Sequence, residues 1–267
     1  MRLLNLRRLP KVWIALATLP FLCTAGLAQQ PVRTVKQGGP SSLAEQYLFA
    51  MANQERAQRG LPVLRWDAAL TQAAMLHARR MADNGHISHQ FPGEPELSAR
   101  AAQAGAKFSK VAENVAEAPT AVMIHDAWMH SEGHRENLLD GAVDSVGIAV
   151  VSRGGELFAV QDFDRGVRSM SLTDQEHAVH GLFSTTGLQV IEGTTEARQT
   201  CAMDTGYAGQ RKPWFVMRFT ASDLTQLPDM LKSKLQTGRY RQASIGACTG
   251  TDTGSFTAYS IAILLYP

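Results

Sequence analysis

The strongest constraint on the fold is a two-residue periodicity on either side of two adjacent glycines. Apolar residues recur at every second position around Gly154-Gly155, with Gln161 in the same register: Val146, Ile148, Val150, Leu157, Ala159 and Phe163. This period is typical of strands that bury one face. Two glycines between such runs favour a tight turn with positive φ. The sequence therefore predicts an antiparallel hairpin whose apolar face must be covered by other elements.

Helix signals precede this hairpin. Ser42-x-x-Glu45 is a capping box, and the helix that it begins is expected to end at Gly60. A second helix is expected between the N-cap Asp67 and Gly85. Further helices are expected over 95–104 and 120–130, with an extended segment over 108–115. Helices followed by strands predict an α+β domain over residues 41–165.

The remainder of the chain has a different character. Residues 166–186 are rich in Ser, Thr, His and Gly and are expected to form a linker. A second, smaller β-rich domain with an α+β composition is expected over residues 187–267. Its elements are one helix at 228–236, with Pro228 in the first turn, and strands at 187–192, 196–203, 214–220, 240–248 and 256–265.

Residues 1–28 have the pattern of a secretory signal peptide. Four basic residues lie in 1–11, an uncharged apolar run fills 12–28, and Gly26-Leu27-Ala28 offers small residues for cleavage. A membrane anchor is the alternative, although the run is marginal for spanning a bilayer. We expect a short linker at 29–40 and a secreted product, extracellular or periplasmic, with no stable membrane span after cleavage.

Charge and cysteine usage agree with export. The formal net charge is +2, and removing the four basic residues of 1–11 leaves two more acidic than basic side chains. Nucleic acid is therefore not expected as a partner, because duplex binding needs a basic surface. Cys201 and Cys248 are the cysteines beyond the signal peptide. In an oxidising compartment they predict one disulfide, worth about 4 kcal/mol; two buried thiols are the alternative.

Several short motifs occur in a fixed order along 43–165. They are Asn53-Gln54-Glu55-Arg56, Asn84-Gly85-His86-Ile87-Ser88-His89, Ala112-Glu113-Asn114-Val115-Ala116, the run from Trp128 to Leu139, and Val146-Gly147-Ile148. Together they resemble the bacterial branch of the CAP superfamily (cysteine-rich secretory proteins, antigen 5 and pathogenesis-related proteins). The resemblance covers about half of the mature chain and implies an α-β-α sandwich with a central cleft.

The resemblance also implies which residues line that cleft. In the family, two histidines and two acidic residues lie there, and the matching positions are His89, Glu113 and His134. The second acidic position falls on Ser131, so the set of four is incomplete. The expected ligand-binding cleft therefore contains His89, Glu113, Ser131 and His134. The family's disulfides are also missing, because 43–165 contains no cysteine.

His89 and His134 are the candidate metal ligands, since neutral imidazole binds zinc or copper at pH 7. A catalytic zinc typically has three protein ligands; Glu113 is a possible third, or it orients a histidine. A hydrogen-bonded structural network is the alternative. His130, Glu132 and His134 lack the H-E-x-x-H spacing of zinc peptidases.

We expect a non-enzymatic binding module whose ligand is a protein, a peptide or a lipid. One alternative is a metal-assisted, peptidase-like hydrolase with His89, Glu113 and His134 as catalytic candidates; another is a lipid-binding carrier. Zinc is a possible cofactor. His177 and His180 fall in the expected linker and are interpreted as surface residues.

Overall fold

The computed structural model describes residues 39–249 and 256–267. The predicted signal peptide at 1–28 and nearly all of the predicted linker at 29–40 lie outside these ranges. The described residues form two mixed four-stranded sheets, each covered by helices. Within these ranges no helix has the length and apolar character needed to cross a bilayer.

The first sheet has the strand order β1-β3-β4-β2. Short β1 (Arg65–Trp66) pairs in parallel with β3 (Ser145–Arg153). β4 (Glu156–Gly166) is antiparallel to β3 and to β2 (Phe108–Ala118). Gly154 and Gly155 have φ of 64° and 91°, so the predicted β3–β4 hairpin is confirmed. Strand β2 lies at an edge of the sheet, which matters for the site below.

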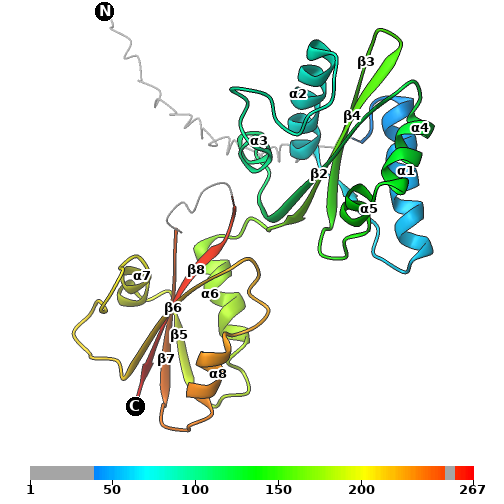
Figure 1. Ribbon diagram of the computed structural model, residues 1–267. Helices are drawn as coiled ribbons and strands as arrows, with labels where there is room; N and C mark the ends of the chain where they lie inside the picture. Colours follow the sequence, from blue (N-terminus) through cyan, green and yellow to red (C-terminus); the bar gives the residue numbers. More distant parts are fainter. Residues whose placement is uncertain (1–38, 250–255) are drawn as a thin grey trace, which may run out of the picture. The chain divides into compact units, whose positions relative to one another are not determined.

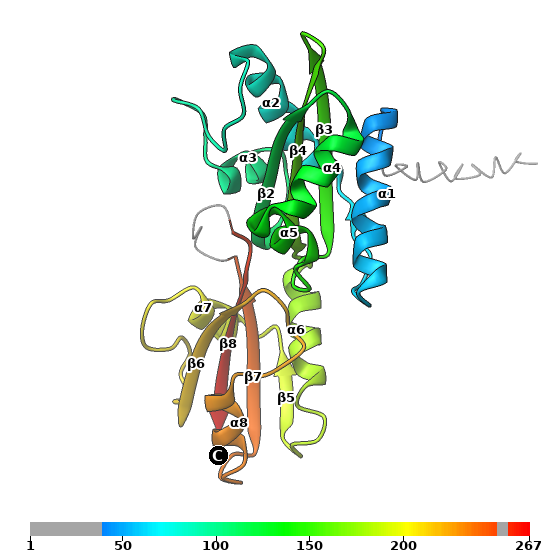
Figure 2. The ribbon, with the colours of Figure 1, turned by 45° about the vertical axis from the view of Figure 1, so that its right-hand side comes forward.

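Helices cover both faces of this sheet. Figures 1 and 2 show α2 (Ala68–Asn84) and α3 (Leu97–Gln103) on one side, and α1 (Leu43–Gln58), α4 (Ala121–His130) and α5 (Glu132–Leu139) on the other. The alternation along the strands produces this division. Ile148 packs with residues of α1 and α4, whereas its neighbour Ala149 packs with residues of α2. The expected α-β-α sandwich is confirmed.

The sequence signals for the helix ends are also confirmed. Ser42 and Glu45 form the capping box of α1, and the Asp67 carboxylate accepts a hydrogen bond from the Leu70 N–H at 2.8 Å. Gly85 ends α2 with φ of 68°. Helix α5 and strand β1 were not expected.

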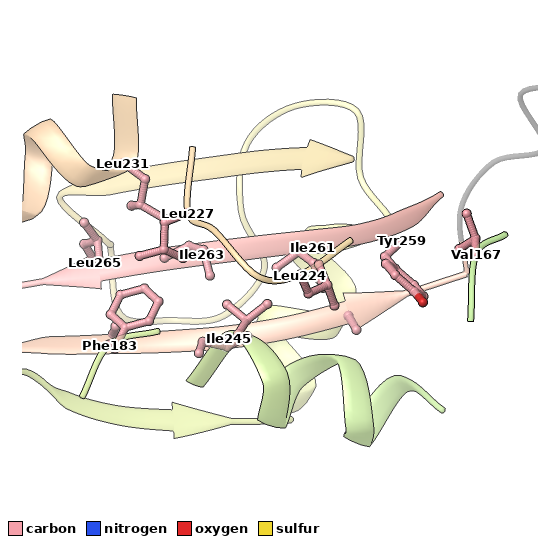
Figure 3. Packing of buried hydrophobic residues seen from close by; sticks show 13 residues of the cluster. Val167, Phe183, Leu224, Leu227, Leu231, Ile245, Tyr259, Ile261, Ile263 and Leu265 are labelled. Carbon is pink, nitrogen blue, oxygen red and sulfur yellow. The ribbon is translucent and has the colours of Figure 1, made fainter. Parts of the chain in front are cut away.

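The second sheet has the strand order β5-β7-β8-β6. Its strands are β5 (Gln189–Glu192), β6 (Phe215–Ala221), β7 (Gln242–Cys248) and β8 (Tyr259–Tyr266). The helices of this region are α6 (Leu172–Gly181), α7 (Thr195–Cys201) and α8 (Asp229–Leu235). Strand β5 is parallel to β7, and the other pairings are antiparallel. Figure 3 shows part of the core of this region, a single cluster to which Leu231 of α8, Phe183 and Ile245 of β7 all belong.

Two expectations for this region are wrong. Residues 166–186 do not form a plain linker, because they contain α6, which is capped by Ser171 and packs Val179 into the core. The segment 196–203 is not a strand but mainly helix α7, which is capped by Thr194. The predicted Cys201–Cys248 disulfide is present and joins the end of α7 to the end of β7.

One glycine in each sheet sets how closely a helix approaches. A Cβ atom at Gly147 in β3 would overlap the backbone of Leu70 and Thr71 in α2. A Cβ at Gly246 in β7 would likewise overlap the backbone of Ala197 and Arg198 in α7. Glycine is required at both positions because the added Cβ would meet backbone atoms, which cannot move away by changing rotamer as a side chain can.

We predict that Gly147→Ala lowers the free energy of unfolding by about 3 kcal/mol, since one methyl group overpacks the contact with α2. Gly133→Ala in α5 is the matched control: its added methyl meets open space, so helix propensity should raise stability by about 0.5–1 kcal/mol. Urea unfolding of both variants tests this. Equal effects of the two substitutions would show that the close approach is not limiting.

Candidate functional site

The candidate site is built on the edge strand β2, where two successive residues face opposite layers of the sandwich. Glu113 faces the side of α2 and α3, because its carboxylate contacts Arg100 of α3. Asn114 faces the side of α5, where its amide donates to the carbonyl of His134 at 3.0 Å. Since β2 has no neighbouring strand beyond it in the sheet, groups from both helical layers meet around this edge.

Both oxygens of the Glu113 carboxylate are engaged. Oε1 lies 2.8 Å from Nδ1 of His89, and Oε2 accepts a hydrogen bond from the guanidinium of Arg100. The side chains of Glu113 and Arg100 are 3% and 5% exposed. A buried carboxylate needs such partners, since an unpaired charge in the protein interior is very costly.

Hydrogen bonds from buried side chains fix the loop between α2 and α3, which carries His89. Fully buried His77 lies 2.9 Å from the Glu94 carboxylate and 2.7 Å from the Ser88 carbonyl. Glu94 also accepts from the Phe91 N–H at 3.0 Å, and Arg100 donates to the His89 carbonyl at 3.2 Å. These contacts fix the loop backbone, so the His89 imidazole has a defined position although 62% of the side chain is exposed.

A second carboxyl group lies behind Glu113. Asp162 of β4 is the register partner of both Glu113 and Gly147, and it is fully buried with no hydrogen-bond partner for either oxygen. Burial, and then the nearby Glu113 carboxylate, raise the pKa of Asp162 well above its usual range. Both causes favour the protonated form of the Asp162 carboxyl group.

His134 of α5 approaches from the other layer. The amide of Asn137, one turn further along α5, donates to Asn114 Oδ1 at 3.0 Å and to the Glu113 carbonyl at 3.2 Å. These bonds join α5 to β2. The imidazole rings of His89 and His134 then lie 6.5 Å apart, centroid to centroid.

The pKa values of the two imidazoles are shifted in opposite directions. The hydrogen bond to Glu113 raises the pKa of His89 above its ordinary value of 6.5. Burial, and then the nearby His89, lower the pKa of His134. At a pH between these two pKa values, His89 is charged and His134 is neutral, which places one proton donor next to one proton acceptor.

The structure thus brings together three of the four expected residues: His89, Glu113 and His134. Ser131 is the N-cap residue of α5, but its side chain makes no capping hydrogen bond, and among the described residues no hydrogen bond joins it to Glu113. Sequence reasoning missed the roles of Arg100, His77 and Asp162. The sequence signal that could have indicated these three residues is a polar or charged side chain at a position that the helix or strand pattern places in the interior.

The cluster does not fit a three-ligand zinc site. Glu113 already uses both oxygens on His89 and Arg100, which leaves two imidazoles as ligands. Across residues 39–249 and 256–267, a single group of three His, Cys, Asp or Glu has ligand atoms within 4.8 Å of one another, and it lies elsewhere.

We predict that Arg100→Met lowers the free energy of unfolding by about 3 kcal/mol or more, because it leaves Glu113 as a buried charge without its main partner. Urea unfolding at pH 8 measures the loss. Adding Glu113→Gln to Arg100→Met should restore part of the stability, since the double variant buries no unpaired charge. If the two losses simply add, the interaction between these side chains is not what stabilises the site.

We predict that His89→Asn raises the pKa of His134, because it removes the neighbouring positive charge. The pKa should stay below 6.5, since the burial of His134 remains. Titration of the His134 ring signals by NMR measures this. His86→Asn, at an exposed position of the same loop, is the control and should leave the pKa unchanged; a drop after His89→Asn would contradict the electrostatic interpretation.

Comparison with known proteins finds a family match within the first part of the chain. Residues 49–163 match the family model CAP, the cysteine-rich secretory protein family. YkwD of Bacillus subtilis (strain 168) is 30% identical over 118 residues, which are 43% of this chain and 46% of the relative. The membrane protein YlbC of the same organism is 30% identical over 111 residues, 40% of this chain and 31% of the relative.

The chain thus spans less than half the length of these two relatives. Among solved structures, an extracellular protein with an SCP domain from Bacillus anthracis matches with 30% identity and a TM-score of 0.42, covering 48% of this chain and 45% of that protein. The motif order, the sandwich and the family match all concern the same residues. The chain therefore carries, in residues 49–163, a domain of the cysteine-rich secretory protein (CAP) family.

Proposed function

We propose that the CAP domain is a non-enzymatic binding module, and that the His89–Glu113–His134 cluster holds an anionic group of its ligand. Charge supports this proposal. When His89 is protonated, two cations, His89 and Arg100, surround one carboxylate, that of Glu113, and the raised pKa of the buried Asp162 favours its uncharged form. The group that remains exposed is the His89 imidazole, so the cluster presents one positive charge to solvent.

The single observation that favours binding over hydrolysis is the engagement of both Glu113 oxygens. A general base must accept a proton from water or substrate, and Glu113 has no oxygen free of a strong donor. Asp162 is fully buried and has no access to solvent. The second acidic position of the family is Ser131 here, so no other carboxylate at that position takes over the role.

A hydrolase remains the second candidate because of His134. Its lowered pKa keeps the imidazole neutral near pH 7, and a neutral imidazole is a good proton acceptor. In that case His134 would activate a water molecule, and the charged His89 would stabilise negative charge on the substrate. The same residues would then act without a metal.

We also propose that the protein is exported. The basic and apolar pattern of residues 1–28 supports cleavage after Ala28. The disulfide between Cys201 and Cys248 agrees with this, since such bonds persist in oxidising compartments.

We predict that a short oligoglutamate peptide binds the full chain and that the affinity rises at least about threefold from pH 8 to pH 6, because lower pH protonates His89. Isothermal titration calorimetry measures it. His89→Asn should weaken binding and abolish the pH dependence, and His86→Asn should change neither. An oligolysine peptide of equal length should not bind; equal affinity for both peptides would refute an anion site.

Hydrolysis distinguishes the two candidates. Incubation with a broad peptide library, followed by mass spectrometry, should yield no cleavage by the wild type beyond that of His134→Ala. Cleavage that disappears in His134→Ala would favour the hydrolase and overturn the binding module.

A further inference from the structure

Helix α6 and the end of strand β5 bring together two histidines and a glutamate, far from the CAP domain in sequence. His177 and His180 are three residues apart on α6, so they share one face of the helix. Glu192 is the last residue of β5 and lies two positions after Val190, which packs against the core that contains Val179 of α6. Alternation along β5 therefore turns Glu192 toward α6 as well.

The three side chains converge on one oxygen. Oε1 of Glu192 lies 3.2 Å from Nδ1 of His180 and 3.5 Å from Nδ1 of His177. One ligand atom from each residue lies within 4.8 Å of the other two. His177, His180 and Glu192 thus form a group of three potential metal ligands, whereas the CAP cluster offers only two imidazoles.

These distances match a metal site. Ligand atoms that each lie about 2.0–2.1 Å from a tetrahedral zinc are about 3.3 Å from one another, which is the spacing from Glu192 to each histidine. Two imidazoles and a carboxylate are also a ligand set that zinc and related ions use in proteins. Since all three ligand atoms lie within 4.8 Å of one another, closing the histidine pair to about 3.3 Å requires a movement of at most about 1.5 Å.

Glu192 carries a second indication. Its Oε2 atom is buried and has no hydrogen-bond partner, although a carboxylate oxygen away from water normally has one. One oxygen of the carboxylate therefore faces both imidazoles, and the other has no donor among the described residues.

The charges nearby do not oppose a cation. The guanidinium of Arg198 lies beside Gly193, the residue that follows Glu192. Its guanidinium makes two hydrogen bonds to the buried Glu176, at 2.7 and 2.6 Å. This pair is neutral as a unit, so Arg198 adds little repulsion at Glu192.

We propose that His177, His180 and Glu192 bind one divalent transition-metal ion of the zinc class. The ion would link α6 to the edge strand β5. The His177 side chain is 80% exposed, so the ion would keep a solvent-facing position for water or for a donor group of a partner molecule. This site is independent of the binding function proposed for the CAP domain.

The test is equilibrium binding of Zn²⁺ to the tag-free full chain, measured by competition with a chromophoric chelator, with Co²⁺ absorption as a second readout. We expect one zinc equivalent and a visible Co²⁺ spectrum of tetrahedral type. Glu192→Gln and His180→Asn should each weaken binding at least about tenfold. His86→Asn and His130→Asn, at exposed histidines of the CAP domain, are matched controls and should bind as the wild type does.

Two further variants separate this site from the CAP cluster. His89→Asn and His134→Asn should leave the zinc affinity unchanged. The proposal is overturned if the wild type binds no zinc, if Glu192→Gln binds it as tightly as the wild type, or if only the His89 and His134 variants lose it. Circular dichroism without metal shows that each variant is folded, so a loss of binding reports on the ligands.

Discussion

The contact between the Glu113 carboxylate and the Arg100 guanidinium is the interaction on which the site depends. It joins the edge strand β2 to helix α3 inside the protein, where water cannot solvate either charge. Because Arg100 satisfies one oxygen, the other is oriented toward His89. Arg100 also fixes the backbone of the loop before α3. One buried interaction therefore sets the orientation of the Glu113 carboxylate and the position of the loop that carries His89.

Much of the CAP domain could be predicted from local sequence. The hairpin and the ends of α1 and α2 follow from residues that act on their immediate neighbours: Gly154-Gly155, Ser42 and Asp67. His89, Glu113 and His134 were found through the resemblance to a family. The roles of Arg100 and Asp162 could not be found in this way, because they depend on the register of β2 with β4 and on how α3 packs. Neither is encoded in a short stretch of sequence.

The C-terminal region was predicted less well, for a physical reason. Helix α6 buries Gln175 and Glu176 along with Val179, so its buried face lacks the apolar period that identifies a helix. Its composition indicated a linker, and His177 and His180 were interpreted as surface residues. Helix α7 is similarly short and polar. Here the caps Ser171 and Thr194 were the better signals.

The candidate site draws its parts from segments under very different constraints. Glu113 lies on a strand in register with Asp162 and Gly147, where any change disturbs the packing of helix on sheet. His89 instead lies on an exposed loop. A lineage of such domains can therefore change the exposed side chain at position 89, the one that the proposed binding function places against the ligand, while the row of residues across the sheet stays fixed. The residues that contact a ligand and the residues that the fold requires can therefore change at different rates during evolution.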